Sequence, residues 1–285
     1  MQTDYVQRFL FEDLDIRGRL VCLTGAWQRM LDGRDYPADI ASLLGHTTAL
    51  NVLLGANQKG SGRVTLQVQG SGPVKLLVAD CTSELRIRGM ASYEKDGAQD
   101  KPSERGLLGD GRLSVTHEDL KSGRLYQSLV PLEGDTLEEI FVHYLSQSEQ
   151  TSAWLRLDAD GGALFGLLLE KLPRADLRDP DGWDRIRHLA STLQLDETRD
   201  VQPYDLLTRV FPEELMRVFR LYAVEYHCPY DEDKVKDMLR GLGREEVESI
   251  LAEQGEVVIR NEMCNHEYRF DCRVLEELFP ESPQA

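Results

Sequence analysis

The sequence predicts an α+β protein, with an N-terminal α/β domain built on a mainly antiparallel sheet, a helical linker and a small C-terminal domain. Up to residue 171, short segments of alternating apolar and polar residues follow one another, joined by Gly-rich turns. After Pro173 the apolar residues recur at helical spacing. Near the C-terminus, Cys228 and Cys264 flank a short helical segment, which suggests a metal clip or a redox clip. We therefore place the first domain at residues 1–173, the linker at 174–225 and the C-terminal domain at 226–285.

The strands of the first domain show the period-two alternation of half-buried β-structure. Val64, Leu66 and Val68, for example, alternate with polar residues. Strands are expected at 5–14, 18–23, 64–69, 74–80, 85–89, 112–117, 126–131, 152–157 and 163–171, and helices at 24–31, 38–54 and 135–145. The polar stretch 92–111 is expected to be a loop within the domain.

The linker and the tail read as mainly helical. From Trp183 to Phe219 the helices carry apolar stripes with charged opposite faces, so they need another surface to cover. We expect that surface to be the strand domain. The tail is expected to hold helices at 235–240 and 244–254 and strands at 255–259 and 268–270.

Charge and cysteine content restrict the partners and the compartment. The chain of 285 residues carries a net charge of −17, which would repel polyphosphates and anionic lipids. We expect no nucleic-acid and no membrane partner. No segment approaches the roughly 20 apolar residues that span a bilayer, and the N-terminus does not resemble a signal peptide. Five cysteines, an odd number, fit a reducing compartment, so we expect a cytoplasmic protein.

Motifs along almost the whole chain carry a resemblance. In the tail, Cys264, Tyr268 and Phe270 follow the acidic run 245–257. Upstream, the matching motifs are, in order, residues 8–12, 16–18, 67–73 and 132–136, and Tyr144 with 148–150. Together they resemble the heat-shock protein 33 family, the 33 kDa redox-regulated chaperonins of bacteria. The resemblance implies a substrate-binding and dimerisation domain at the N-terminus and a zinc-binding-like redox switch at the C-terminus.

The chain departs from that family's zinc motif. The family pattern is Cys-x-Cys, then about thirty residues, then Cys-x-x-Cys, with four thiolates around one zinc ion. Here Tyr230 stands at the second position of the first pair and Asn261 at the first position of the second pair, so only Cys228 and Cys264 remain and half of the ligand set is missing.

The two remaining cysteines are the candidate site. Because the family's thiols converge on one metal, Cys228 and Cys264 are expected to be neighbours, and they are the redox-active disulfide candidates if their Cα atoms lie within about 7 Å. They are also the candidate zinc ligands. Two thiolates do not close a tetrahedral site, so His266, His227, Asp231 or Cys272 would have to complete it, and His266 is the best placed. We expect weak or absent stoichiometric zinc.

The other cysteines have simpler interpretations. Cys22 and Cys81 lie in strand patterns and are expected to be buried structural thiols. Cys272 follows the last strand and is a candidate resolving thiol. The Gly-rich segment 70–73 lacks the lysine and helix of a phosphate-binding loop, so we interpret it as a turn.

The resemblance implies an ATP-independent holdase, not an enzyme. In such proteins a folded tail keeps the linker over an apolar face, and opening under oxidative or heat stress lets a homodimer capture unfolding clients. With a depleted ligand set, we expect temperature to contribute more than oxidation. Two alternatives stay open. One is a protein-binding module that has lost zinc and redox control, and the other is a thiol-dependent enzyme, which the acidic residues around Cys228 and Cys264 disfavour.

Overall fold

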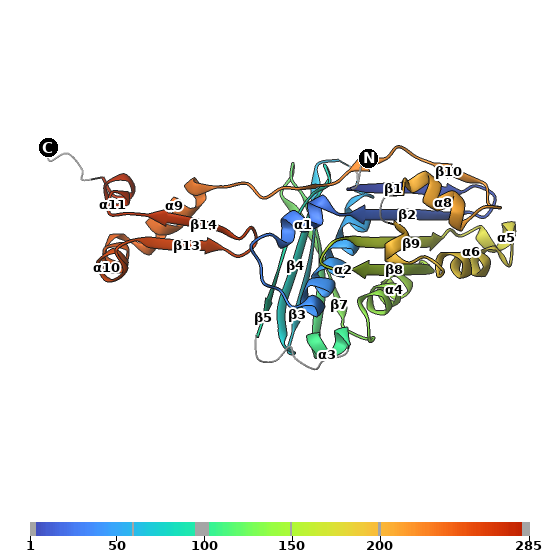
Figure 1. Ribbon diagram of the computed structural model, residues 1–285, viewed down its shortest axis with the longest axis horizontal. Coiled ribbons are helices and arrows are strands. Elements are labelled where there is room, and N and C mark those ends of the chain that lie inside the picture. The colour runs from blue at the N-terminus through green and yellow to red at the C-terminus, as the bar shows by residue number, and fades with distance from the viewer. Residues whose placement is uncertain (1–3, 59, 95–102, 149, 199–200, 281–285) are drawn as a thin grey trace. The chain divides into compact units, whose positions relative to one another are not determined.

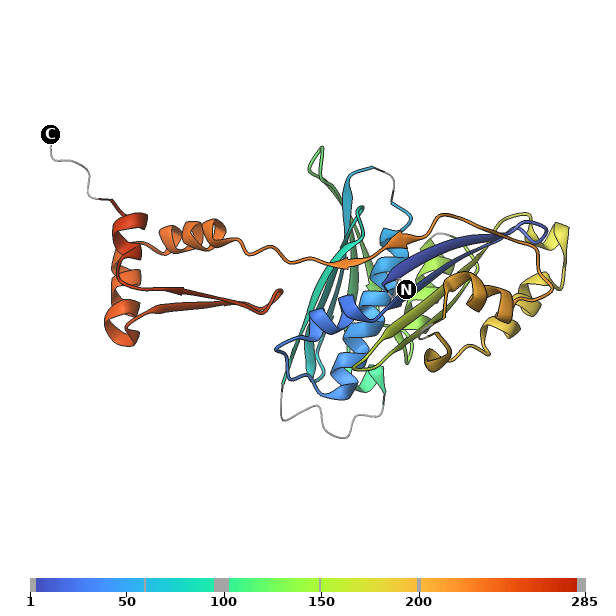
Figure 2. The same cartoon turned by 45° about the horizontal axis from the view of Figure 1, so that its top comes forward.

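Two sheets enclose one long helix in the larger part of the protein (Figures 1 and 2). The computed structural model describes residues 4–58, 60–94, 103–148, 150–198 and 201–280. The chain divides into two compact units, Met1–His227 and Cys228–Ala285, which we call the core unit and the tail unit. The presence of both helices and β-sheets confirms the predicted α+β class.

The first sheet has six strands, and its pairings are antiparallel. Their order is β10 (Met216–Val218), β1 (Tyr5–Phe11), β2 (Ile16–Leu23), β9 (Leu164–Lys171) and β8 (Ala153–Ala159), with β11 (Tyr222–Ala223) also on β1. Strand β9 is the predicted Leu-rich strand, and its first seven residues are buried. Both of its faces are covered, which explains the absence of a polar alternation.

The second sheet also has six strands. Their order is β12 (Glu225–Tyr226), β5 (Arg86–Tyr93), β4 (Val74–Thr82), β3 (Gly62–Gly70), β6 (Gly111–Asp119) and β7 (Arg124–Pro131). All pairings are antiparallel except that of β12 with β5. The predicted loop 92–111 falls partly on residues 95–102, outside the described residues, and its remainder includes α3 (Glu104–Leu108).

Helix α2 (Ala38–Gly55) lies between the two sheets and contacts strands of both. Its buried residues include Leu43, Leu44, Leu50 and Leu53, which point in different directions around the helix axis. A helix that is apolar all round is buried on all sides. Other helices that contribute to the same core are α1 (Gly25–Leu31), α3 and α4 (Leu137–Ser148). No helix among the described residues is long and apolar enough to cross a membrane.

Four short helices pack on the other face of the first sheet. They are α5 (Ala175–Arg178), α6 (Gly182–Ala190), α7 (Leu195–Thr198) and α8 (Pro203–Val210). Their apolar residues, such as Trp183, Ile186 and Leu206, form one buried cluster with Phe9 and Phe165 of the strands. The amphipathic linker therefore covers the strand domain, as its stripes predict.

The prediction of helix as far as Phe219 is wrong. Helix α8 ends at Val210, and residues 216–218 form the edge strand β10 instead. Pro212 explains the early end, because a proline disfavours helical geometry in the preceding residue, here Phe211 with ψ +60°. Beyond it, β10, β11 and β12 lead the chain along the edges of both sheets to the tail unit.

The tail unit has its own small core. It contains α9 (Glu232–Leu242), α10 (Arg244–Gln254), the hairpin of β13 (Val257–Asn261) with β14 (His266–Phe270), and α11 (Val274–Leu278). Its buried residues are Leu239, Val247, Leu251, Val257, Tyr268, Phe270, Val274 and Leu278. A core of this size gives a marginal stability by itself.

A charged cluster ties α2, α3 and α4 together and makes the core unit sensitive to pH. Glu104 bonds the His46 ring through one carboxylate oxygen and accepts the Leu137 N–H (2.6 Å) through the other. Burial lowers the pKa of His46, but the hydrogen bond and charge of Glu104, with Glu138 and Asp158, raise it overall. A raised pKa in the folded protein stabilises it fully below the unfolded histidine pKa, roughly 6.5, and this stability is lost as pH rises through the folded pKa.

We therefore expect His46→Gln to destabilise the protein by about 1 to 2 kcal/mol near pH 6 and by less in alkaline solution. Urea unfolding between pH 5.5 and 9 measures the difference. His143→Gln is the matched control, since His143 is half exposed. If His46→Gln lowers the free energy of unfolding by the same amount at every pH, the proposed stabilisation by protonated His46 is contradicted.

Candidate functional site

A disulfide bond between Cys228 and Cys264 closes the tail unit. The two residues are 36 positions apart and their Cα atoms lie 5.7 Å from one another, within the usual range for disulfides. Cys228 is the first residue of the tail unit, and Cys264 lies in the turn between β13 and β14. The structure thus brings together the two cysteines that the sequence singled out. The bond encloses α9, α10 and β13 in one covalent loop.

The turn that carries Cys264 is held by its own hydrogen bonds. The Cys264 N–H lies 3.2 Å from the backbone oxygen of Asn261 and 3.3 Å from its side-chain Oδ1. Asn265 has φ +56°, which asparagine tolerates, and its Oδ1 accepts the Arg260 Nε–H at 2.7 Å. Asn261 stands at a position where the family pattern has a cysteine, and its side chain stabilises the turn instead.

Tyr230, at the other altered position, belongs to an aromatic cluster with Tyr268 and His266. Its ring stacks on that of Tyr268, with centroids 4.4 Å apart and planes inclined by 24°. The His266 ring lies 5.8 Å away. Tyr268 is only 1% exposed, and its hydroxyl accepts the N–H of Asp231 at 3.0 Å. This aromatic clip, Tyr230 with His266 and Tyr268, joins the start of the tail unit to β14.

The residues present do not fit a closed tetrahedral zinc site. Among the residues that the structure describes, no group of three or more His, Cys, Asp or Glu side chains could hold a metal ion. Cys228 and Cys264 are bonded to each other, and His266 does not join them as a third ligand. Its Nδ1 is buried without a hydrogen-bond partner.

The other candidate ligands have other positions. The N–H of His227 donates to the Ile87 oxygen (3.0 Å), and His227 ends the core unit. Asp231 caps α9 by accepting the Lys234 N–H at 3.0 Å. Cys272 is exposed beyond β14. None of these contacts gives the side chain a metal-binding role.

Cys22 and Cys81 are buried free thiols in the core unit. Burial raises the pKa of Cys22 to about 11 and that of Cys81 to about 12. Because the thiolate is the reactive form, both are inert at neutral pH. This agrees with the structural role expected for them.

The linker helices cover an apolar face of the first sheet. It presents Phe9, Phe11, Ile16, Leu20 and Phe165, all at most 1% exposed. Phe211, at the end of α8, lies over it with its ring centroid 5.0 Å from that of Phe11. We call α5 to α8 with Phe211 the cover, and the surface beneath it the covered face.

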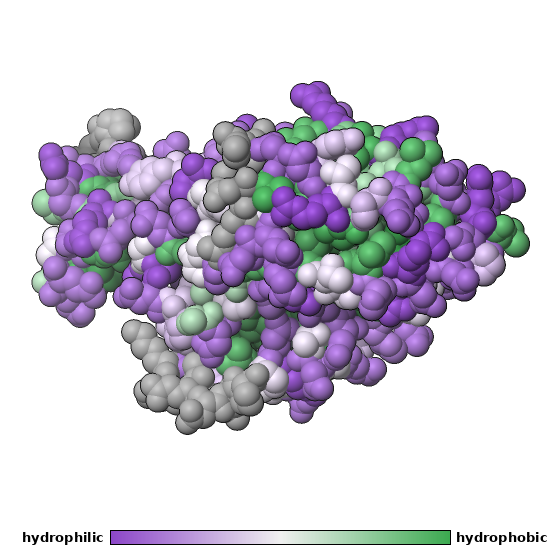
Figure 3. Space-filling model, turned by 45° about the vertical axis from the view of Figure 1, so that its right-hand side comes forward, coloured by the Kyte–Doolittle hydropathy of each residue, from purple (hydrophilic) through white to green (hydrophobic). Residues whose placement is uncertain are grey.

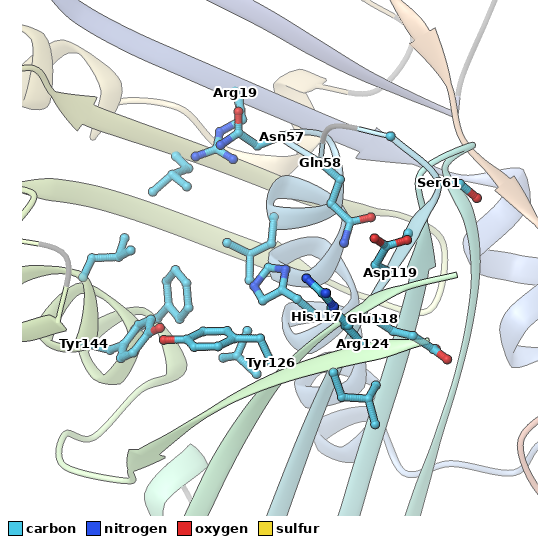
Figure 4. A pocket seen from close by; sticks show the side chains of 18 of the residues that line it. Arg19, Asn57, Gln58, Ser61, His117, Glu118, Asp119, Arg124, Tyr126 and Tyr144 are labelled. Carbon is cyan, nitrogen blue, oxygen red and sulfur yellow. The ribbon is translucent and has the colours of Figure 1, made fainter. Parts of the chain in front are cut away.

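A pocket of about 680 Å³ opens on the opposite side of the first sheet. Figure 4 shows Arg19 with Asn57 at one end, Tyr126 and Tyr144 at another, and His117 between them. Arg17 and Arg19 of β2 both bond Glu170 of β9 there, and Arg19 and Glu170 are buried. The charge of the arginines lowers the pKa of Glu170, although burial alone raises it.

This charged triad was not predicted from the sequence. One signal was available: Arg19 directly precedes the apolar run 20–23, and Glu170 directly follows the Leu-rich run of β9. A charge that is buried needs a partner. The pairing register of β2 with β9, however, cannot be obtained from either strand alone.

Comparisons with known proteins agree with the motifs. The family model described as Hsp33 protein matches residues 4–271. The 33 kDa chaperonin of Methylobacillus flagellatus is 39% identical over 279 residues, covering 97% of this chain and 94% of the relative. That of Nitrosococcus oceani is 40% identical over 282 residues, covering 99% and 96%. The crystal structure of the 33 kDa chaperonin from Thermotoga maritima shares the fold, with a TM-score of 0.81, 23% identity and 97% coverage of each chain.

Proposed function

The chain belongs to the Hsp33 family of chaperones, and from this premise we propose that it is an ATP-independent holdase that captures unfolding proteins when its cover opens. Its relatives are named as chaperonins and not as enzymes, so a non-enzymatic chaperone is the function that the family supports. The observation that carries the finer proposal is the covered face. A holdase needs apolar surface that is hidden at rest and accessible under stress.

The cover is suited to opening because its helices are too short to be stable alone. They contain four, nine, four and eight residues, whereas isolated helices need about 12 to 15 residues even for marginal stability. They therefore depend on the contact with the sheet. Loss of that contact would release cover and face together, which favours a cooperative opening with temperature.

The tail unit would control the cover through the connecting strands. Strands β10 and β11 pair with β1, and β12 pairs with β5, so the segment from Met216 to Tyr226 holds the end of the cover against both sheets. Cys228 follows this segment after one residue, His227. We propose that unfolding of the tail unit loosens this segment through the covalent connection.

Apolar residues on the core unit favour protein partners. Figure 3 shows apolar surface, in green, gathered on the face of that unit which this view brings forward. The edge strand β7 exposes Leu125, Tyr126 and Leu129. Exposed apolar edges pair with other chains. We propose unfolded clients as partners, a homodimer as the active form and the cytoplasm as the location.

The test is light scattering from a thermally unfolding client protein, with the full chain added at increasing temperatures. We expect little suppression at 25 °C and strong suppression, at about one chain per client, once the cover opens. Samples with peroxide, with reductant and without either should be compared, and zinc should be measured in each. A chain that never suppresses aggregation would refute the holdase.

A second candidate, a heat-responsive holdase without metal control, is favoured by one observation. Tyr230 and Asn261 replace two of the four thiolates and are used in packing and in the turn. In this version temperature opens the cover whatever the zinc concentration. Activity that is unchanged by a chelator such as EDTA would support it.

A further inference from the structure

We propose that redox control in this chain runs opposite to that of a zinc-thiolate switch: the disulfide between Cys228 and Cys264 latches the tail unit shut, and its reduction opens it. The inference rests on the proposed holdase function and names its regulation. A zinc-held tail is folded when its thiols are reduced, because the metal binds thiolates and leaves when they are oxidised. A tail that is folded when reduced and open when oxidised therefore depends on a bound metal ion. The side chains that the structure describes do not form a set of ligands that fits a metal ion.

The first argument is that the side chains at both altered positions make contacts that need no metal ion. Tyr230 stacks on the buried Tyr268, and Asn261 accepts the N–H of Cys264. A vacated ligand position would leave a polar hollow around the remaining thiols. Here Tyr230 and Asn261 occupy both positions with side chains that are not thiolates, so the reduced tail lacks two of the four zinc ligands of the family pattern.

The second argument is the position of the bond. It closes a loop that contains α9, α10 and β13, which supply Leu239, Val247, Leu251 and Val257 to the tail core. A cross-link stabilises a folded unit by restricting its unfolded chain, and more so when the loop is long. For a small core this constraint is a large part of the total stability. The oxidised tail is therefore the closed form.

The reaction is an ordinary thiol–disulfide exchange with a dithiol as reductant. A thiolate of the reductant attacks the half-buried sulfur of Cys228 and displaces Cys264, which is 5% exposed, as a thiolate that takes up a proton. The second thiol of the reductant then attacks the mixed disulfide and releases Cys228. Two electrons and two protons pass to the protein, and the reductant becomes a disulfide.

In the reduced state the tail loses its covalent link and depends on non-covalent contacts such as the aromatic clip and the small core. Temperature alone can then open it, which agrees with the heat response expected of this chain. Oxidation by hydrogen peroxide, which takes up two electrons and two protons from the thiols and becomes water, forms the bond between Cys228 and Cys264 again and would stop capture. The exposed Cys272 stays outside the pair.

The experiment uses the full chain carrying Cys272→Ser, which excludes exchange with the third tail thiol. Oxidised and dithiothreitol-reduced samples are compared by hydrogen exchange over the tail helices and by client light scattering at each temperature. We expect reduction to lower the unfolding midpoint of the tail by on the order of 10 °C and to lower the onset of capture. The double variant Cys228→Ser with Cys264→Ser should behave like the reduced chain, and its unfolding midpoint should not change when reductant is added.

A second variant keeps the test independent of folding failure. Tyr230→Cys with Asn261→Cys supplies four thiols, and with zinc its reduced form should be the more stable one, which reverses the sign. Three results would overturn the inference. The tail of the Cys272→Ser chain could have the same unfolding midpoint in the oxidised and reduced states, or its reduced state could bind stoichiometric zinc. Capture of clients could also increase with peroxide. Absence of capture in both states would refute the holdase instead, while hydrogen exchange would still decide on the latch.

Discussion

Phe211→Ala is expected to open the cover at a lower temperature than in the unmodified chain. The side chain is 1% exposed and packs edge-on against Phe11 at 5.0 Å and near Phe9 at 6.4 Å. Removing a buried phenylalanine ring costs about 3 to 5 kcal/mol, because transfer free energy is lost and a cavity remains. The cavity would lie between the cover and the covered face. The cost therefore falls on the contact that holds the cover.

Hydrogen exchange over α6 and α8 measures the opening, and client light scattering at increasing temperature measures its consequence. The control is Tyr204→Ala on the same helix, where the side chain is 60% exposed and its loss should change stability by less than about 0.5 kcal/mol. Faster exchange with an unchanged onset of capture would show that the covered face does not bind clients. Unchanged exchange would show that Phe211 does not hold the cover.

Glu170→Ala is expected to destabilise the whole core unit, by about 3 to 5 kcal/mol. Glu170 is 3% exposed and bonds Arg17 through Nε (2.9 Å) and Nη2 (2.7 Å) as well as the buried Arg19. Its removal leaves the Arg19 guanidinium inside the protein with the Leu53 carbonyl as a remaining acceptor. An uncompensated buried charge carries a large desolvation penalty. Urea unfolding at pH 7 measures the loss.

The same residue predicts the acid response. Because the folded pKa of Glu170 is lowered, its stabilisation is fully present above the unfolded glutamate pKa, roughly 4.3, and is lost as pH falls through the folded value. The difference in free energy of unfolding between the Glu170→Ala variant and the unmodified chain should therefore become smaller as pH falls through the folded pKa of Glu170. Asp184→Ala is the control, since its pair with Arg187 is exposed and is worth at most about 1 kcal/mol. Combining Glu170→Leu with Arg19→Met should recover most of the loss, and a variant without that recovery would contradict the charge argument.

The secondary structure was largely predictable because it is encoded in neighbouring residues. The alternation of Val64, Leu66 and Val68 is found in β3, and the helical spacing of 38–54 is found in α2. The linker shows where prediction of secondary structure from neighbouring residues fails. Residues 216–218 have apolar content that suits either a helix or a strand, and the open edge of β1 decided for a strand.

The candidate site was predictable only in part. The pairing of Cys228 with Cys264 followed from the resemblance, whereas the stack of Tyr230 on Tyr268 did not. Tyrosine at position 230 could only be interpreted as a missing ligand until its partner, 38 positions away, was seen beside it.

By itself, the sequence determined the α+β class, the family and the two cysteines, because alternation, helical spacing and short motifs are local properties of the chain. Only the tertiary structure decided which face the linker covers, which acid neutralises Arg19 and what replaces the absent thiolates. These are contacts between residues far apart in the chain. Their partners are selected by sheet register and by the exclusion of water when the units fold, and neither can be obtained from a single segment.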